Sequence, residues 1–244
     1  MKSHTAIAEK IIVALDVPHP SDAKKLLSEL KGIPCYLKVG MQLFYASGPQ
    51  FILMLKEQGY RVFLDLKLHD IPNTVKGAAD SITRLGVDMF NVHAAGGSRM
   101  MEAALEGIDT ALSARVGIQR PIVIAVTQLT STSQIVLNSE IGIPGNVEES
   151  VLHYANLAKQ AGLNGVVTSP LEVAAIKQTC GSSFLTIVPG IRPHGSAIGD
   201  QFRIMSPKQA FAQGADYIVI GRPITTADNP RQALESIIKE LSEP

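Results

Sequence analysis

Cysteine is scarce in this chain, which holds only Cys35 and Cys180 among its 244 residues. Two cysteines are too few for the disulfide framework that supports many small secreted domains. No apolar run approaches the roughly 18 residues that a membrane-spanning helix requires. The first ten residues, MKSHTAIAEK, also lack the apolar core of a signal peptide. We therefore expect a soluble, cytoplasmic protein with no membrane partner.

Net charge is lacking as well, because 22 Lys and Arg residues balance 22 Asp and Glu residues. Without a basic excess, no overall field draws nucleic acid or an anionic membrane surface. An anionic ligand therefore has to be bound by a local pocket. The hydrophobic share of 45% is enough for a sizeable core, and the charged share is only 18%. This balance indicates a compact enzyme rather than a disordered chain.

Apolar, β-branched runs alternate with helix-period segments along the chain, with no linker, low-complexity tract or second domain between them. The predicted strands are residues 11–17, 35–40, 61–68, 88–94, 121–129, 165–169, 184–190 and 217–223. The predicted helices include residues 21–30, 74–86, 98–112, 147–162, 206–214 and 229–241. Repeated strand–helix units predict an α/β protein, a (β/α)8 TIM barrel that forms a single domain over residues 1–244. A doubly wound open sheet is the alternative, but no GxGxxG motif follows the first strand.

Residues at the ends of the predicted helices fit their usual positions. Ser21 and Asn229 stand where an N-cap belongs, and Pro207 and Pro230 stand in first turns. The glycines predicted to close helices are Gly59, Gly86, Gly162 and Gly214.

Polar residues gather at the C-terminal ends of the predicted strands, where barrel enzymes hold their active sites. From the first strand to the fifth, they are Asp16, Lys38, Asp65, Lys67, Asn91, His93, Thr127 and Thr130. Each has a structural explanation when taken alone, since Asp16 would serve to cap a turn and His93 as a hydrogen-bonded core histidine. Their convergence on one rim predicts a functional site.

Asp65 and Lys67 are the most informative of these residues, because they interrupt the apolar run at residues 63–68. A strand sends residues i and i+2 to the same face, so the two side chains point the same way. A carboxylate and an ammonium in apolar surroundings are costly unless paired, and such sites often perform chemistry. A structural ion pair is the alternative interpretation.

The ends of the seventh and eighth strands predict a phosphate site. Barrels frequently bind phosphate there through backbone N–H groups and a helix start. Gly221 permits close backbone approach, and it precedes Arg222, a fixed cation with fork geometry. The loop from residue 191 to residue 205 adds Arg192, Gln201 and Arg203, which suit folding over an anion.

The run FLDLKLHDIPNT resembles the D-x-K-x-x-D-I-P-x-T signature of the orotidine 5′-phosphate decarboxylase family. The similarity extends over nearly the whole chain, through ALDV, LKVG, NVHAAGG, AVTQLTS, VPGIRP and VIGRPIT. The shorter pattern D-x-K-x-x-D is less specific, because sugar-phosphate decarboxylases and aldolases of the same superfamily share it. The resemblance implies a cofactor-free carboxy-lyase that converts orotidine 5′-monophosphate to uridine 5′-monophosphate in pyrimidine biosynthesis.

The resemblance also implies a role for each matching residue. Lys67 would donate a proton to C6 of the pyrimidine, with Asp65 beside the substrate carboxylate, while Asp16 and Lys38 would hold the ribose hydroxyls. Asp70 and Thr74 would reach into the site of the second subunit of a homodimer. The residues implied to contact the base or the phosphate are Thr130, Arg192, Gln201, Gly221 and Arg222.

Two alternative functions remain open at this point. A metal-dependent sugar-phosphate decarboxylase or synthase of the same superfamily typically carries a metal-binding glutamate on the second strand. This chain has Lys38 there, and a cation does not bind Mg²⁺, so we expect no metal site. A barrel that binds phosphorylated metabolites without turnover is the other alternative, and the full set of charged residues argues against it.

Overall fold

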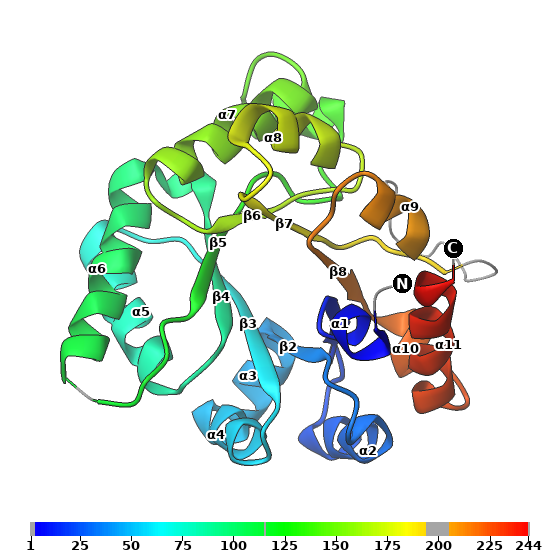
Figure 1. Ribbon diagram of the computed structural model, residues 1–244. Helices are drawn as coiled ribbons and strands as arrows, with labels where there is room; N and C mark the ends of the chain where they lie inside the picture. The colour runs from blue at the N-terminus through cyan, green and yellow to red at the C-terminus, as the bar shows by residue number, and fades with distance from the viewer. Residues whose placement is uncertain (1–2, 115, 194–204, 244) are drawn as a thin grey trace.

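A computed structural model describes residues 3–114, 116–193 and 205–243 of the chain. Eight parallel strands form a closed barrel in sequence order, and the last strand pairs with the first (Figure 1). The strands are β1 (Ile11–Ala14), β2 (Tyr36–Gly40), β3 (Arg61–Leu68), β4 (Met89–His93), β5 (Ile122–Val126), β6 (Gly165–Val167), β7 (Leu185–Val188) and β8 (Tyr217–Ile220). The predicted TIM barrel is confirmed, and closure between β8 and β1 excludes the open sheet.

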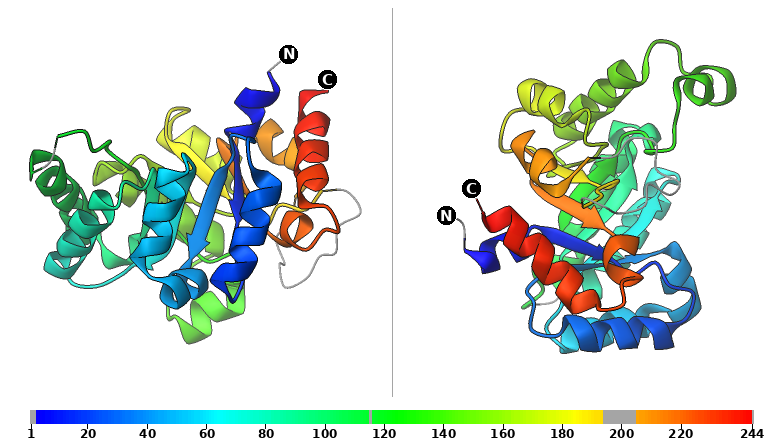
Figure 2. Two further views of the ribbon diagram at one scale, coloured as in Figure 1. Left: turned by 90° about the horizontal axis from the view of Figure 1, so that it is seen from below. Right: turned by 90° about the vertical axis from the view of Figure 1, so that its right-hand side faces the viewer.

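Helices surround this barrel (Figures 1 and 2). They are α1 (His4–Ala8), α2 (Pro20–Leu30), α3 (Met41–Ser47), α4 (Pro49–Glu57), α5 (Pro72–Arg84), α6 (Ser98–Ala114), α7 (Val147–Gln160), α8 (Val173–Cys180), α9 (Pro207–Ala212), α10 (Arg222–Thr225) and α11 (Pro230–Ser242), with short helical turns η1 (Ala94–Gly96) and η2 (Val136–Glu140). The six predicted helices are present as α2, α5, α6, α7, α9 and α11. None of the helices in the described ranges combines the length and apolar character needed to cross a bilayer.

The predicted helix ends are correct with one exception. The Asn229 side chain caps α11, and Pro207 and Pro230 begin α9 and α11. The predicted closing glycines all have positive φ values, directly after the C-cap residues of α4, α5, α7 and α9. The N-cap prediction for Ser21 is wrong, because α2 already begins at Pro20 with His19 as its N-cap. Proline fits this first position because the N–H that it lacks would have no partner within the helix.

The barrel interior is apolar at its lower levels and charged above them. Side chains that point inward form a small cluster of Ile12, Ala14, Tyr36, Phe63, Met89, Ile124, Ile187 and Val219. Two residues further along β2, β3 and β4, the inward positions are Lys38, Asp65 and Asn91. The strand period therefore places charged and amide groups directly above an apolar floor.

At the opposite, N-terminal end of the barrel, side chains that directly precede β4, β6 and β8 hold neighbouring strands together. Asp88, Asn164 and Asp216 accept hydrogen bonds from the backbone N–H groups of Val62, Val123 and Thr186, at 2.7 to 2.8 Å. The two aspartates also bind an ammonium each, from Lys56 and Lys177, whereas the neutral Asn164 carries no charge to be balanced. These bonds fix the starts of neighbouring strands and thereby support the rim above.

Candidate active site

A cavity of about 630 Å³ lies at the C-terminal ends of the strands. Its lining includes most of the residues that the sequence predicts for the site, namely Asp16, Lys38, Asp65, Lys67, Thr130, Arg192, Gly221 and Arg222. The polar residues of distant sequence segments therefore do converge on one space.

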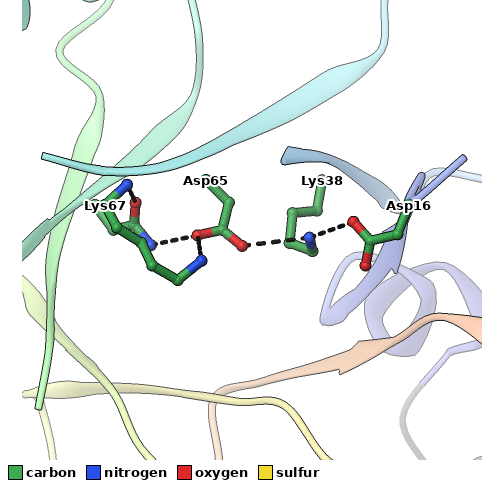
Figure 3. A network of polar contacts seen from close by, with 5 residues as sticks. Asp16, Lys38, Asp65 and Lys67 are labelled. Atoms are coloured by element: carbon green, nitrogen blue, oxygen red, sulfur yellow. Dashed lines mark hydrogen bonds and ion pairs between the residues drawn. The ribbon is translucent and has the colours of Figure 1, made fainter. Parts of the chain in front are cut away.

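Four of these side chains form a row of alternating charge (Figure 3). Lys38 Nζ lies 2.8 Å from Asp16 Oδ1 and 3.3 Å from Asp65 Oδ2. Lys67 Nζ in turn donates a hydrogen bond of 2.7 Å to Asp65 Oδ1. Each carboxylate thus has an ammonium beside it, and Lys67 stands at the end of the row.

The middle of this row is removed from water, since Lys38 and Asp65 are each only 8% exposed. Burial alone would lower the pKa of Lys38, but the carboxylates of Asp65 and Asp16 outweigh it and raise that pKa above its usual value. Burial likewise disfavours ionised Asp65, yet Lys38, Lys67 and the Asn91 amide together lower the pKa of its carboxyl group. Both groups are therefore charged at neutral pH.

Gly40, at the end of β2, leaves space for the Asp16 and Lys38 side chains to meet. A Cβ atom at this position would lie 3.2 Å from both Asp16 Oδ1 and Lys38 Nζ. Such contacts are tighter than ordinary packing, so a larger residue would push the Asp16–Lys38 pair apart. The glycine of the LKVG segment is therefore part of the site, which sequence reasoning missed.

Lys67 has an unusual backbone conformation. It is the one non-glycine residue with positive φ in the described parts of the chain, with φ of 53°. A side chain in this left-handed region costs roughly 1–3 kcal/mol, and surrounding contacts must hold it there. Asp65 and Lys67 both line the cavity inside the barrel, as predicted. The regular pairing of β3 with β4 is nevertheless interrupted between Leu64 and Leu68.

Asn91 on β4 contacts both Asp65 and Lys67 of β3. Its Nδ2 donates to Asp65 Oδ1 at 2.7 Å, and its Oδ1 accepts from the Lys67 N–H at 2.8 Å. The sequence marked Asn91 only as one polar residue among several at the strand ends. Asn91 follows Met89 by two residues on the same strand, and Met89 points into the barrel. Strand alternation therefore indicates that the Asn91 side chain also points into the barrel, toward the site.

His93 follows on the same strand and is half-buried beside the His69 ring, at 5.4 Å between centroids. Burial, with further contributions from His69 and Lys67, lowers its pKa to about 4. His93 is therefore neutral at pH 7 and adds no second cation next to Lys67.

Arginines lie on the opposite wall of the cavity. Arg192 follows β7 and Arg222 follows β8, whereas Lys67 is on β3, across the barrel (Figure 1). The cavity thus has a row of alternating charge on one side and guanidinium groups on the other. A molecule with an anionic end and a separate reacting centre matches this arrangement.

Asp70 and Thr74 do not belong to the cavity lining that the structure describes. Both are exposed, beyond the end of β3 and in the first turn of α5. Asp70 Oδ1 accepts a hydrogen bond of 2.6 Å from the N–H of the next residue, Ile71. Gln201 and Arg203, which the sequence placed near the phosphate, lie outside the described residues.

Metal ligands do not gather in the described part of the protein, where no group of three or more His, Cys, Asp or Glu side chains is arranged to hold an ion. The carboxylates of Asp16 and Asp65 are instead neutralised by Lys38 and Lys67.

Comparison with known proteins concerns the chain as a whole. Residues 9–237 match the sequence profile of the orotidine 5′-phosphate decarboxylase / HUMPS family. The orotidine 5′-phosphate decarboxylase of Bacillus cereus (strain AH820) is 52% identical over 231 residues, which cover 95% of this chain and 96% of that protein. A crystal structure of orotidine 5′-phosphate decarboxylase from Lactobacillus acidophilus has a TM-score of 0.85 and 42% identity, and covers 96% of this chain and 99% of that one. An uncharacterised conserved protein from Geobacillus kaustophilus superposes with a TM-score of 0.84 at 48% identity, and covers 95% of this chain and 99% of that one. This chain therefore belongs to the orotidine 5′-phosphate decarboxylase / HUMPS family.

Proposed function

We propose that this protein converts orotidine 5′-monophosphate to uridine 5′-monophosphate and CO₂, as a carboxy-lyase of pyrimidine biosynthesis. The observation that carries the proposal is the row from Asp16 to Lys67 inside the barrel cavity (Figure 3). It occurs in a chain that is 52% identical, over 95% of its length, to a protein named for this activity. We further propose that residues 1–244 act as one catalytic domain in the cytoplasm.

The two walls of the cavity suggest how the nucleotide lies. Arg192 and Arg222, with the Gly221 N–H, would bind the phosphate, while Lys67 would face C6 of the pyrimidine. Asp16 and Lys38 lie between these ends and would bind the ribose hydroxyls. Thr130 lines the same cavity and would contact the base. Gln201 is proposed as a further phosphate ligand.

The chemistry requires a cation at C6. When the bond from C6 to the carboxylate breaks, CO₂ leaves and the electron pair stays on C6, in an orbital that the ring cannot readily delocalise. The Lys67 ammonium stabilises this charge and then donates its proton to C6, and solvent reprotonates the amine. Asp65 holds Lys67 in place through the 2.7 Å hydrogen bond. No cofactor is required in this scheme.

The direct test is the loss of orotidine monophosphate absorbance when purified protein is added, with uridine monophosphate identified as the product. Turnover that produces one uridine monophosphate per substrate consumed is expected. Binding without turnover would instead favour the barrel that only binds phosphorylated metabolites.

Metal independence distinguishes the proposal from the sugar-phosphate decarboxylase alternative. Lys38 occupies the place of a metal-binding glutamate and pairs with two carboxylates, at 2.8 and 3.3 Å. Because ammonium groups already neutralise Asp16 and Asp65, exhaustive chelation with EDTA is expected to leave kcat unchanged. Loss of activity in EDTA that added Mg²⁺ restores would support the metal-dependent alternative.

Arg222 is expected to bind the phosphate rather than the base. The Arg222→Ala substitution should weaken uridine monophosphate binding by about 10- to 100-fold, because charge-assisted hydrogen bonds contribute roughly 1.5–3 kcal/mol. Binding of uridine, which lacks the phosphate, should hardly change. Calorimetric titration of both ligands checks this, and equal losses for the two would place Arg222 elsewhere on the substrate.

We also propose a homodimer in which each site receives Asp70 and Thr74 from the partner subunit. Support comes from their exposure at the barrel mouth, outside the lining of the cavity of their own barrel. Ile71, between them, is 67% exposed, as an apolar residue at an interface would be in an isolated chain. A twofold axis would bury the same patch on both subunits and complete two sites.

A further inference from the structure

The pairing between β3 and β4 is irregular where the site is built. Leu64 pairs with Phe90, but the next paired residues are Leu68 and Val92. Residues 65–67 of β3 therefore lie opposite the single residue Asn91 of β4. Such bulges bend a strand and re-aim its side chains, and they are common next to active sites.

Asn91 fills this irregularity with its side chain. It is 1% exposed, and both ends of its amide are in use. The carbonyl oxygen accepts from the Lys67 N–H at 2.8 Å, where the shift in register interrupts the strand ladder. The amide nitrogen donates to Asp65 Oδ1 at 2.7 Å, the oxygen that also accepts from Lys67 Nζ. One buried side chain thus holds the backbone of Lys67 and the carboxylate that orients its ammonium.

We propose that Asn91 is the positioning residue that keeps Lys67 in its left-handed conformation and aims its ammonium at the reacting carbon. This inference rests on the proposed function for its effect on turnover. Asn91 acts through Lys67 and Asp65, so its loss should impair the proton transfer more than the binding of the nucleotide.

The first experiment compares Asn91→Ala with Asn164→Ala. Asn164 is a matched control, because its Oδ1 also accepts from a backbone N–H of the neighbouring strand, that of Val123, at 2.8 Å. This bond lies at the N-terminal end of the barrel, away from the cavity. Asn91→Ala is expected to lower kcat by about 100-fold with little change in KM, since small misplacements of a reacting group have effects of that size. Asn164→Ala is expected to lower the melting temperature while kcat stays close to that of the wild type.

The second experiment uses Asn91→Asp, which is close to the native side chain in shape. When protonated, the introduced carboxyl group can accept from the Lys67 N–H and donate to Asp65, as the amide does. When ionised, it cannot donate a hydrogen bond and it repels the Asp65 carboxylate. The Lys67 and Lys38 ammonium groups also lie nearby, and His93 on the same strand is neutral. The ratio of its kcat to the wild-type kcat should therefore rise as the pH falls from 8 to 5, by at most about tenfold per pH unit.

The outcomes of these experiments decide whether Asn91 positions Lys67. Wild-type kcat in folded Asn91→Ala would overturn the proposal, as would losses of kcat equal to those of Asn164→Ala at equal stability. Should Asn91→Ala fail to fold, a kcat ratio for Asn91→Asp that does not change with pH would overturn it. Should the wild-type protein not decarboxylate orotidine monophosphate, the proposed function fails, and hydrogen exchange still tests the positioning. Faster exchange of the Lys67 amide in the Asn91 variants supports it, and unchanged exchange contradicts it.

Discussion

Replacing Lys67 with alanine is expected to lower kcat by at least about a thousandfold, because one group supplies both the charge at C6 and the proton. The protein should remain folded, since Lys67 lies at the barrel mouth and is only partly buried. Asp65 would keep Lys38 as a partner at 3.3 Å, which limits the cost of removing the ammonium. Steady-state kinetics and thermal unfolding of the purified variant measure both effects.

Lys67→Arg provides the matched control for charge. A guanidinium keeps the positive charge but is planar, larger and unable to release a proton at neutral pH. We therefore expect Lys67→Arg to remain inactive while both variants still bind uridine monophosphate through the Arg222 side of the cavity. Decarboxylation at the wild-type rate by Lys67→Ala would remove Lys67 from the mechanism.

Mixing two inactive variants is expected to restore activity. Asp70→Ala should be inactive because, in the proposed dimer, Asp70 completes the site of the partner subunit. When Lys67→Ala and Asp70→Ala subunits exchange, one site of each heterodimer collects both substitutions and the other collects none. An equal statistical mixture should therefore regain up to about a quarter of the wild-type activity per total site.

A second mixture controls for this result. Asp65 and Lys67 lie in the same cavity, so a heterodimer of Lys67→Ala and Asp65→Ala contains no intact site. This mixture should stay inactive under the same conditions. If the mixture of Lys67→Ala with Asp70→Ala demonstrably exchanges subunits and also stays inactive, Asp70 serves its own barrel.

The eight strands could be predicted because parallel barrel strands are buried on both faces and appear as continuous apolar runs. The polar rim could be predicted for the same reason, since Asp65 and Lys67 interrupt such a run. The predicted strands often extend two or three residues too far, as in 11–17 against Ile11–Ala14 for β1. Leu15 and Val17 continue the apolar pattern of β1 although they lie beyond its end.

The fine geometry of the site could not be predicted, because it depends on contacts between segments that are distant in sequence. The left-handed conformation of Lys67 requires the register shift against β4 and the Asn91 side chain. The need for Gly40 depends on where the Asp16 and Lys38 side chains meet. The sequence does not indicate helices α3 and α4 clearly, because Gly48 and Pro49 divide that segment into two short pieces.

A crystal structure of the wild-type protein with bound uridine monophosphate tests most directly whether C6 of the pyrimidine faces Lys67 while the phosphate lies on the opposite wall. We expect the Lys67 ammonium to be the charged group in contact with C6, with the phosphate bound to Arg192 and Arg222. The same structure should show the Lys67 backbone still bonded to Asn91. A nucleotide bound in the reverse direction, with its phosphate against Lys67, would show that Lys67 is not the proton donor to C6.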